Sequence, residues 1–412
     1  MLWASPKAFR KTGHFMCKLV KKYSRRAARR AWLAALLAVC ALAAPLNAAR
    51  AAGQTLDFSA PLTTRWLYAT DETVNLTPAA HGDRIYLPLA AGVLVALDVP
   101  AGQLLWKADM GGAISAAPAA DERGVYVATE ATTGAPAQAT TDASGPQAFY
   151  RATGALRALS QKSGVTLWMR TLPGPIRGAL ATDGDQLYAG TADGRVYAFN
   201  RETGEVRWQQ QYNAPFASQP VATAGRLFIG SEDGSLLLLD EGTGRPLWRY
   251  QTRGALRGPV ALANQLALFG SADGYVYALD EQTGRLRWRT RTGAGVQSVA
   301  ATPHGLLVAS LDNFVYLLSY RRGVRVWKRL LAGRIAAQPL TSAEGALFAP
   351  LGGDACVVLA LHDGKTLNTL LVGEDGNTAA TPVLAADTLL ITTRHGLMAF
   401  APPTTAAQRP AN

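Results

Sequence analysis

The sequence has little cysteine. It holds three in 412 residues, Cys17, Cys40 and Cys356, and only Cys356 lies after residue 52. An exported chain without its first 52 residues would therefore have no intramolecular disulfide. Cys356 lies in the apolar run ACVVLAL, so we expect it to be a small, buried hydrophobic residue.

Beyond its first 52 residues the sequence also lacks an excess of charge of one sign. The formal net charge is +12, but residues 1–52 hold 11 Lys or Arg and no Asp or Glu, which leaves 30 basic and 29 acidic residues. A nucleic-acid-binding surface needs an excess of Lys and Arg on the folded part. We therefore predict no nucleic-acid partner.

Recognisable catalytic and metal-binding motifs are missing as well. The sequence contains no nucleophile elbow, HExxH pair, Walker loop or Cys/His cluster. Its five histidines are scattered and are interpreted as turn and surface residues: His14, His81, His304, His362 and His395. The sequence predicts no catalytic, cofactor-binding or metal-binding residue, and we interpret the chain as a non-enzyme.

The hydrophobic run in the leader is short. It extends from Ala31 to Ala44, about 14 residues, whereas a membrane-spanning helix needs roughly 20. A basic segment precedes it and small residues follow, which is the order of an export signal. Residues 1–52 are interpreted as a leader cleaved at Ala49-Arg50-Ala51. An uncleaved anchor is one alternative, and lipidation at Cys40 is another, although Val39 stands where a small residue is expected.

Glycine and a repeated unit are abundant. The chain has 40 glycines, and the clearest copy of the unit is DGYVYALDEQTGRLRW, Asp273 to Trp288. Asp273-Gly274 and Thr283-Gly284 are turn signals, because glycine adopts a positive φ without steric cost. Tyr275 to Leu279 is aromatic, β-branched and apolar, which is typical of a strand.

Tryptophans mark the period of this unit. They are Trp66, Trp106, Trp168, Trp208, Trp248, Trp288 and Trp327, with Asn368 in the eighth place. The spacing is 39 to 41 residues, except for 62 between Trp106 and Trp168. A period of 40 is typical of a four-stranded propeller blade. The sequence therefore predicts an all-β fold, an eight-bladed propeller of four-stranded antiparallel blades, whose tryptophans pack between blades.

The chain ends predict how the ring closes. The last unit has three strands, and an isolated strand around Thr63 to Tyr68 carries Trp66. Pairing that strand with the last unit hides edges that would otherwise template aggregation. We expect one propeller over residues 53–403, a loop insertion from Thr129 to Gly154 in blade 2, and a disordered tail over 404–412.

The pattern ALDxxTGxxxW, here Ala278 to Trp288, resembles the tryptophan-docking repeats of quinoprotein (PQQ-type) β-propellers. Two function classes share that fold: PQQ-dependent dehydrogenases, and non-catalytic relatives such as BamB of the outer-membrane β-barrel assembly machinery. The enzymes bind the quinone with Ca²⁺, which takes about six to eight oxygen ligands. The expected inner connections offer few acidic residues: Asp71, Glu72, Asp109, Glu374 and Asp375. The BamB-like interpretation, without a cofactor, fits better.

One local match concerns partner binding. Leu256-Arg257-Gly258 resembles a Leu-Arg-Gly element that BamB proteins use toward their barrel partner, and Ile176-Arg177-Gly178 is a near copy. The resemblance implies that Arg177 and Arg257 pair with partner groups and that Leu256 is an apolar anchor. The alternative is that both arginines satisfy backbone carbonyls near the central channel.

A second group of arginines flanks the tryptophans on the outer strands. Its members are Arg207, Arg249, Arg287, Arg289, Arg325 and Arg329. They are interpreted as charges that block edge-to-edge pairing, with a basic patch as the alternative.

The sequence thus predicts a periplasmic propeller scaffold at the outer membrane, a monomer within a complex that assembles outer-membrane β-barrels. The alternatives are a PQQ-dependent dehydrogenase or PQQ-binding sensor, and a scaffold of another envelope complex. Because Cys40 lacks a convincing lipidation signal, we expect membrane association through partners.

Overall fold

The structure is a computed structural model that describes residues 56–133, 151–374 and 376–403. These residues form strands and turns, and none of the described segments is a helix that could cross a membrane. The expected leader, the possible lipidation at Cys40 and the expected tail after residue 403 lie outside the described residues.

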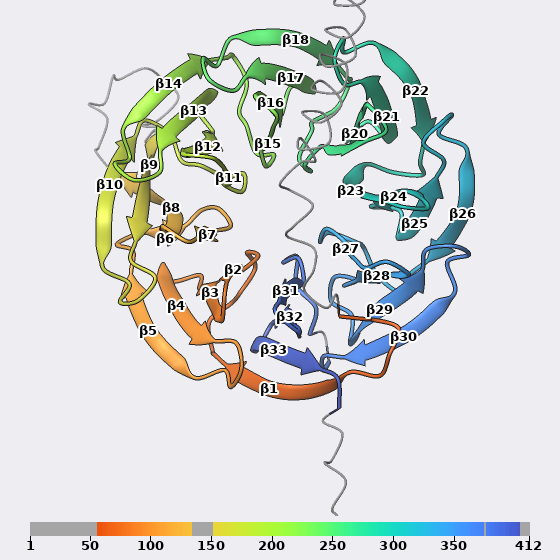
Figure 1. Cartoon of the computed structure of the whole chain (residues 1–412), viewed down its shortest axis with the longest axis horizontal. Coiled ribbons are helices and arrows are strands. Elements are labelled where there is room, and N and C mark those ends of the chain that lie inside the picture. The colour runs from red at the N-terminus through yellow and green to blue at the C-terminus, as the bar shows by residue number, and fades with distance from the viewer. Residues whose placement is uncertain (1–55, 134–150, 375, 404–412) are drawn as a thin grey trace, which may run out of the picture. The chain divides into compact units, whose positions relative to one another are not determined.

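Eight antiparallel sheets are arranged as the blades of a ring, as predicted (Figure 1). Each blade is a meander whose strands run from the centre outward, here called A, B, C and D. A-to-B and C-to-D turns therefore emerge at one face of the ring. B-to-C turns and the D-to-A connections between blades emerge at the other face, here called the connection face.

The strands are grouped by blade. Blade 1 has β2 (Ala79–His81), β3 (Arg84–Pro88), β4 (Val93–Asp98) and β5 (Leu104–Asp109), and blade 2 has β6 (Ala113–Ile114), β7 (Ala119–Asp121), β8 (Gly124–Thr133), β9 (Arg151–Leu159) and β10 (Thr166–Leu172). Blade 3 has β11 (Ala181–Asp183), β12 (Gln186–Gly190), β13 (Arg195–Asn200) and β14 (Val206–Gln211), and blade 4 has β15 (Val221–Thr223), β16 (Arg226–Gly230), β17 (Ser235–Asp240) and β18 (Pro246–Gln251). Blade 5 has β19 (Ala261–Ala263), β20 (Leu266–Gly270), β21 (Tyr275–Asp280) and β22 (Leu286–Arg291), and blade 6 has β23 (Val296–Thr302), β24 (Gly305–Ser310), β25 (Phe314–Leu318) and β26 (Arg325–Leu330). Blade 7 has β27 (Leu340–Thr341), β28 (Gly345–Phe348), β29 (Ala355–Ala360) and β30 (Thr366–Leu371), and blade 8 has β31 (Val383–Ala385), β32 (Thr388–Thr393), β33 (Gly396–Ala401) and β1 (Thr63–Ala69).

Burial explains the strand compositions. The B and C strands lie between neighbouring blades, so both of their faces are covered and their residues read as continuous apolar runs, such as LALFG in β20. The D strands form the outer rim and bury alternate residues, as β22 does with Trp288. The core is therefore a series of apolar layers between blades rather than one central mass.

Each repeat tryptophan joins its blade to the next blade. The indole Nε1 donates a hydrogen bond of 2.6–3.3 Å to a carbonyl at the next C-to-D turn. The ring also lies against the glycine of that turn, which has a φ between +65° and +70°. The contacts pair Trp66 with Gly102, Trp106 with Gly164, Trp168 with Gly204, Trp208 with Gly244, Trp248 with Gly284, Trp288 with Gly323 and Trp327 with Gly364.

Blade 8 joins the two ends of the chain. Strand β1 pairs with β33 in a register that places Thr63 opposite Ala401. Asn368 takes the tryptophan position in blade 7, and its Nδ2 donates to the carbonyls of Phe58 (3.2 Å) and Ala60 (2.9 Å). Phe58 is 1% exposed in the layer between blades 7 and 8. The segment before β1 thus takes the place of a C-to-D turn.

Blade 2 differs from its expected boundaries. The sequence predicts a loop from Thr129 to Gly154, but β8 and β9 stay paired along their length into this segment, until Thr133 lies opposite Arg151. The strands continue because the backbone groups of residues 130–133 and 151–154 pair with each other as an antiparallel ladder. Only residues 134–150 remain between the strands, and they lie outside the described residues.

Cys356 is buried in β29, with 0% of its surface exposed. Its Sγ lies 3.1 Å from Oδ1 of Asn377, and burial raises the pKa of the thiol to about 12. The expectation of a small buried side chain is met for this residue.

Substituting the docked glycine tests the contact between blades. In Gly244→Ala the new Cβ would lie 2.4 Å from the Trp208 ring, so we expect a loss of about 2–4 kcal/mol in the free energy of unfolding, measured by urea denaturation. Gly225→Ala is the matched control, because its φ of +77° is similar and nothing lies within 4 Å. It should lose about 1 kcal/mol. Equal losses would refute a steric role for the ring.

Thiol reactivity tests the burial of Cys356. In a Cys17→Ser/Cys40→Ser background, the folded protein should react with a disulfide reagent at neutral pH far more slowly than the denatured protein does. A thiol with a raised pKa stays protonated as the pH rises, until the pH approaches about 12, and the thiolate is the reactive form. Rapid labelling of the folded protein would contradict this placement.

Candidate protein-binding site

The D-to-A connections hold the connection face together through backbone hydrogen bonds. Phe216 N donates to Thr191 O in blade 3 (3.1 Å), while Glu232 N in blade 4 donates to Pro215 O (2.9 Å). The connection into blade 5 repeats this arrangement through Leu256 N and Ser231 O (3.0 Å). Each of these connections thus bonds to the B-to-C turns of two adjacent blades, which fixes their positions.

This bonding sets which side chains point inward. Ile176, Phe216 and Leu256 occupy equivalent positions, and each is 1% exposed. The residue after each of them points toward solvent: Arg177, Ala217 or Arg257. Two arginines 80 positions apart are therefore presented in the same way, on either side of an alanine.

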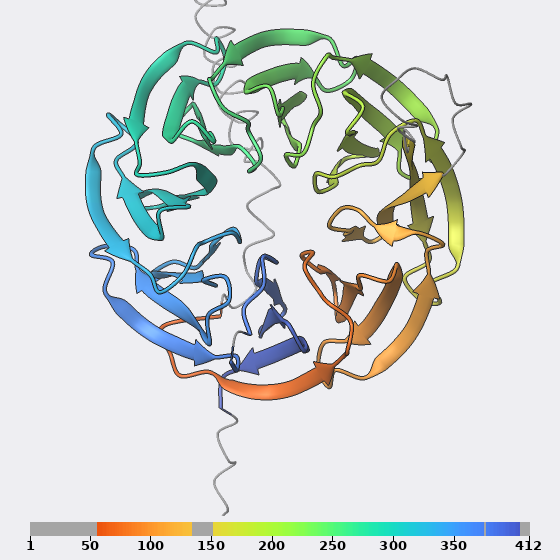
Figure 2. The same cartoon turned by 180° about the vertical axis from the view of Figure 1, so that it is seen from behind.

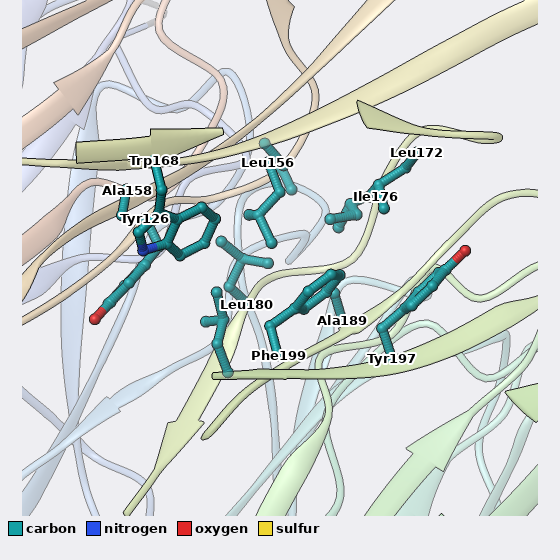
Figure 3. Packing of buried hydrophobic residues seen from close by; sticks show 13 residues of the cluster. Tyr126, Leu156, Ala158, Trp168, Leu172, Ile176, Leu180, Ala189, Tyr197 and Phe199 are labelled. Carbon is teal, nitrogen blue, oxygen red and sulfur yellow. The ribbon is translucent and has the colours of Figure 1, made fainter. Parts of the chain in front are cut away.

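Ile176 shows how the inward residue is held. It belongs to the apolar layer between blades 2 and 3, with Leu156 and Leu172 from one blade and Ala189 and Phe199 from the other (Figure 3). The backbone of Ile176 also bridges to Thr191. Packing and backbone pairing together fix the direction of the next residue in the chain.

Leu256 is placed differently from the expectation of an exposed anchor. It packs between blades 4 and 5 with Phe228 and Phe269, and its Cβ lies 2.6 Å from where a Cβ on Gly230 would be. The connection turns this residue inward because its N–H bonds to Ser231. Leu256 is therefore a core residue that positions Arg257, and it is not a surface contact.

Arg177 and Arg257 pair with carboxylates, not with the backbone carbonyls of the channel. Arg257 donates through Nε and Nη2 to the two oxygens of Glu232, both at 3.1 Å. Arg177 donates through Nη2 to Glu130 at 3.0 Å. The hydrogen bonds that Arg257 donates to Glu232, together with the negative charge of this carboxylate, raise the pKa of Arg257. Both arginine side chains remain more than half exposed, at 55% and 57%.

A pocket of about 630 Å³ connects the two arginines. Its walls include Pro173 from the connection into blade 3, and Pro215 and Phe216 from the connection into blade 4. Arg177, Arg257 and Glu232 also line it. The pocket thus combines apolar walls with charges of both signs, a composition suited to binding a protein segment.

The glutamates were not identified from the sequence. Glu130 lies in the extended β8 and Glu232 in a B-to-C turn, 47 and 25 positions from their arginines. No spacing rule joins such positions, because the contact arises between adjacent blades. The sequence did contain one sign of Glu232. The residue before the turn Asp-Gly is alanine in the neighbouring blades, Ala192 and Ala272, but glutamate in blade 4.

Two of the acidic residues considered for Ca²⁺ bond to turns. Glu72 accepts a hydrogen bond from Ala91 N at 3.1 Å, and Asp109 accepts one from Gly111 N at 2.8 Å. Within residues 56–133, 151–374 and 376–403, no three His, Cys, Asp or Glu side chains gather into a metal site. Asp375 lies outside these ranges.

In the described residues, eight blades form a ring, and seven of their interfaces have a tryptophan–glycine contact, which defines a propeller of the PQQ-like, quinoprotein type (Figure 2). A family model described as "Outer membrane protein assembly factor BamB" matches residues 20–145, 152–259 and 239–409. The chain belongs to the BamB family.

Solved structures show the same fold. BamB from Moraxella catarrhalis is 16% identical, with a TM-score of 0.68 over 82% of this chain and 99% of that one. The computationally designed Ika8 protein is 15% identical, with a TM-score of 0.67 over 81% and 98%. Quinohemoprotein alcohol dehydrogenase ADHIIG from Pseudomonas putida HK5 is 14% identical, with a TM-score of 0.66 over 85% and 78%. A search of curated proteins gave no match.

Stability measurements distinguish the roles of two adjacent residues. Leu256→Ala should reduce the free energy of unfolding by about 2–4 kcal/mol, because it opens a cavity between blades 4 and 5. Arg257→Ala should change it by about 1 kcal/mol or less, since the ion pair is largely exposed. Urea denaturation of both variants tests this, and a larger loss for Arg257→Ala would refute the placement.

Proposed function

We propose that the protein is a non-catalytic periplasmic scaffold that binds a protein partner in the assembly and insertion of outer-membrane β-barrel proteins. Membership of the BamB family supports this role. The observation that carries it is the pocket that brings Arg177 and Arg257 to one site from different blades. The export signal predicted from the sequence of residues 1–52 supports the periplasmic location.

The chemistry of the pocket suits a partner segment with acidic and apolar side chains. Arg177 contacts Glu130 through Nη2, and its other guanidinium nitrogens can bind a partner carboxylate, since they have no hydrogen bond within the described part of the chain. Pro173 and Pro215 are exposed and offer rigid apolar surface that loses little entropy on binding. Arginine at the edge of such a pocket is a frequent source of binding energy.

Glu232 contributes selectivity to this site. The two oxygens of Glu232 already accept hydrogen bonds from Arg257. A partner must therefore either replace Glu232 or accept a further hydrogen bond from the same guanidinium group. Because Glu130 and Glu232 offset the charges of the two arginines, selectivity rests on the geometry of the guanidinium groups and not on net charge. The surface therefore favours a partner whose acceptor groups match these guanidinium groups.

Affinity capture tests this function. The tagged full chain is purified from envelope membranes, and the outer-membrane barrel-assembly subunit in the eluate is quantified. Arg177→Ala/Arg257→Ala should reduce its recovery at least about tenfold, equivalent to about 1.4 kcal/mol of binding energy. Arg207→Ala/Arg245→Ala removes two exposed arginines outside the pocket and should leave recovery unchanged.

The control experiments decide between functions. Equal recovery with both double variants, when both are folded, would refute the proposed site. PQQ and Ca²⁺ are added to the purified protein in parallel. A bound-quinone absorbance would favour the alternative of a quinone-dependent enzyme or sensor, a class that shares this fold.

A further inference from the structure

The C-to-D turn of blade 6 differs from those of blades 4 and 5. In blade 5, Asp280 Oδ1 accepts hydrogen bonds from Thr283 N (2.9 Å) and Oγ1 (2.7 Å), and Asp240 and Thr243 repeat this in blade 4. Blade 6 has Ser319-Tyr320-Arg321-Arg322 at the same positions. This turn has therefore exchanged a stabilising carboxylate for two positive charges.

Tyr320 keeps the altered turn in place. Its carbonyl accepts the Trp288 Nε1 bond at 2.6 Å, and its hydroxyl donates to Thr302 O at 2.8 Å. The docking contact between blades 5 and 6 is thus retained, with Gly323 against the Trp288 ring. Arg321 and Arg322 are presented to solvent from a fixed backbone.

Positive charge is concentrated in this sector of the ring. Residues 285–334 contain ten Lys or Arg and one acidic residue, Asp312, which leaves 20 basic and 28 acidic residues elsewhere after residue 52. Asp312 lies in a B-to-C turn at the opposite face, where it accepts a hydrogen bond from Tyr316 (2.5 Å). It does not neutralise the arginines at the C-to-D turns.

We use the name cationic rim for the exposed residues among 281–288 and 320–327, which are the C-to-D turns of blades 5 and 6 and the first halves of the adjacent strands β22 and β26 (Figure 1, Figure 2). Its basic members are Arg285, Arg287, Arg321, Arg322 and Arg325. Arg287 pairs with Asp280, whereas the other four form no ion pair with an acidic residue in the described part of the chain. Leu286, Val324 and Val326 lie among them, 43%, 60% and 54% exposed.

A pocket of about 340 Å³ opens within the cationic rim. Arg287 and Arg321 line it together with Trp288, Tyr320 and Leu266. Two guanidinium groups beside aromatic and aliphatic surface match a ligand that carries an anionic group on an apolar body.

Protection of strand edges does not explain this distribution. If the arginines only blocked edge pairing, every outer strand would need them. Strand β30 has the sequence TLNTLL without a charge, and its Leu371 is 72% exposed. Arginines also lie on β14 and β18, but β22, β26 and the turns before them hold the densest group, which indicates a common anionic target.

We propose that the cationic rim docks the propeller on the surface of a bilayer that contains anionic phospholipid. Headgroup phosphates satisfy the guanidinium groups, and the acyl boundary accepts the leucine and valine side chains between them. A soluble acidic protein would meet the charges but would gain less from the exposed leucine and valine side chains. The cationic rim lies opposite the connection face, so both faces can be occupied at once.

Vesicle co-sedimentation of the full chain tests the docking. The vesicles are phosphatidylcholine alone, or phosphatidylcholine with about one-third phosphatidylglycerol, at about 0.1 M salt. We expect binding to the anionic vesicles. Arg321→Ala/Arg322→Ala/Arg325→Ala should weaken binding at least about tenfold. The corresponding triple lysine variant should retain most of it, because lysine keeps the charge.

A charge-matched control excludes an effect of net charge and of the basic leader. Arg207→Ala/Arg245→Ala/Arg253→Ala removes three exposed arginines outside the cationic rim and should bind as the wild type does. Equal loss in both alanine variants, or undiminished binding of the rim variant, would overturn the proposal. The proposal would also be overturned if added inorganic phosphate, at constant ionic strength, abolished binding of the wild type to the vesicles. That result would indicate a site for free phosphate. Partner capture does not enter these readouts, so this proposal and the proposed function fail independently.

Discussion

The contact between a tryptophan ring and the glycine of the next blade is the interaction on which the whole ring depends. A blade alone leaves both faces of its B and C strands uncovered, and only a neighbour on each side covers them. The glycine allows the ring to approach the turn backbone, and the indole N–H satisfies a carbonyl there. Stability is therefore shared among eight interfaces, so a defect in one weakens the burial of two blades.

The blades could be predicted from the sequence because the residues that build them repeat. Trp208, Gly244 and their counterparts are local signals at a constant spacing, and burial on both faces makes the strands apolar. The inward position of Leu256 was missed, since an apolar residue before an exposed arginine looks the same in sequence whether it faces the core or solvent. The Arg257–Glu232 contact was also missed, because it depends on how adjacent blades are rotated about each other.

The functional surfaces lie where the copies differ. The connection face has arginine in two of three equivalent positions, with alanine between them, and so forms a pocket from residues that the repeat itself does not require. On the other face, blade 6 has Ser319 and Arg322 where the turns of blades 4 and 5 have Asp and Thr, while Tyr320 preserves the docking contact. A repeat architecture tolerates such changes because the interfaces, not the turns, carry most of the stability.

The pairing of Thr63 with Ala401 has a consequence for the order of folding. These residues are 338 positions apart, so the first strand of the propeller to be synthesised must wait for the last before its edge is covered. Such a contact raises the entropic cost of closure and delays it until the chain is complete. Until then the unfinished ring exposes two open strand edges to other chains. Once it is closed, the ring resists local opening at its ends, so unfolding is slowed as well as disfavoured thermodynamically.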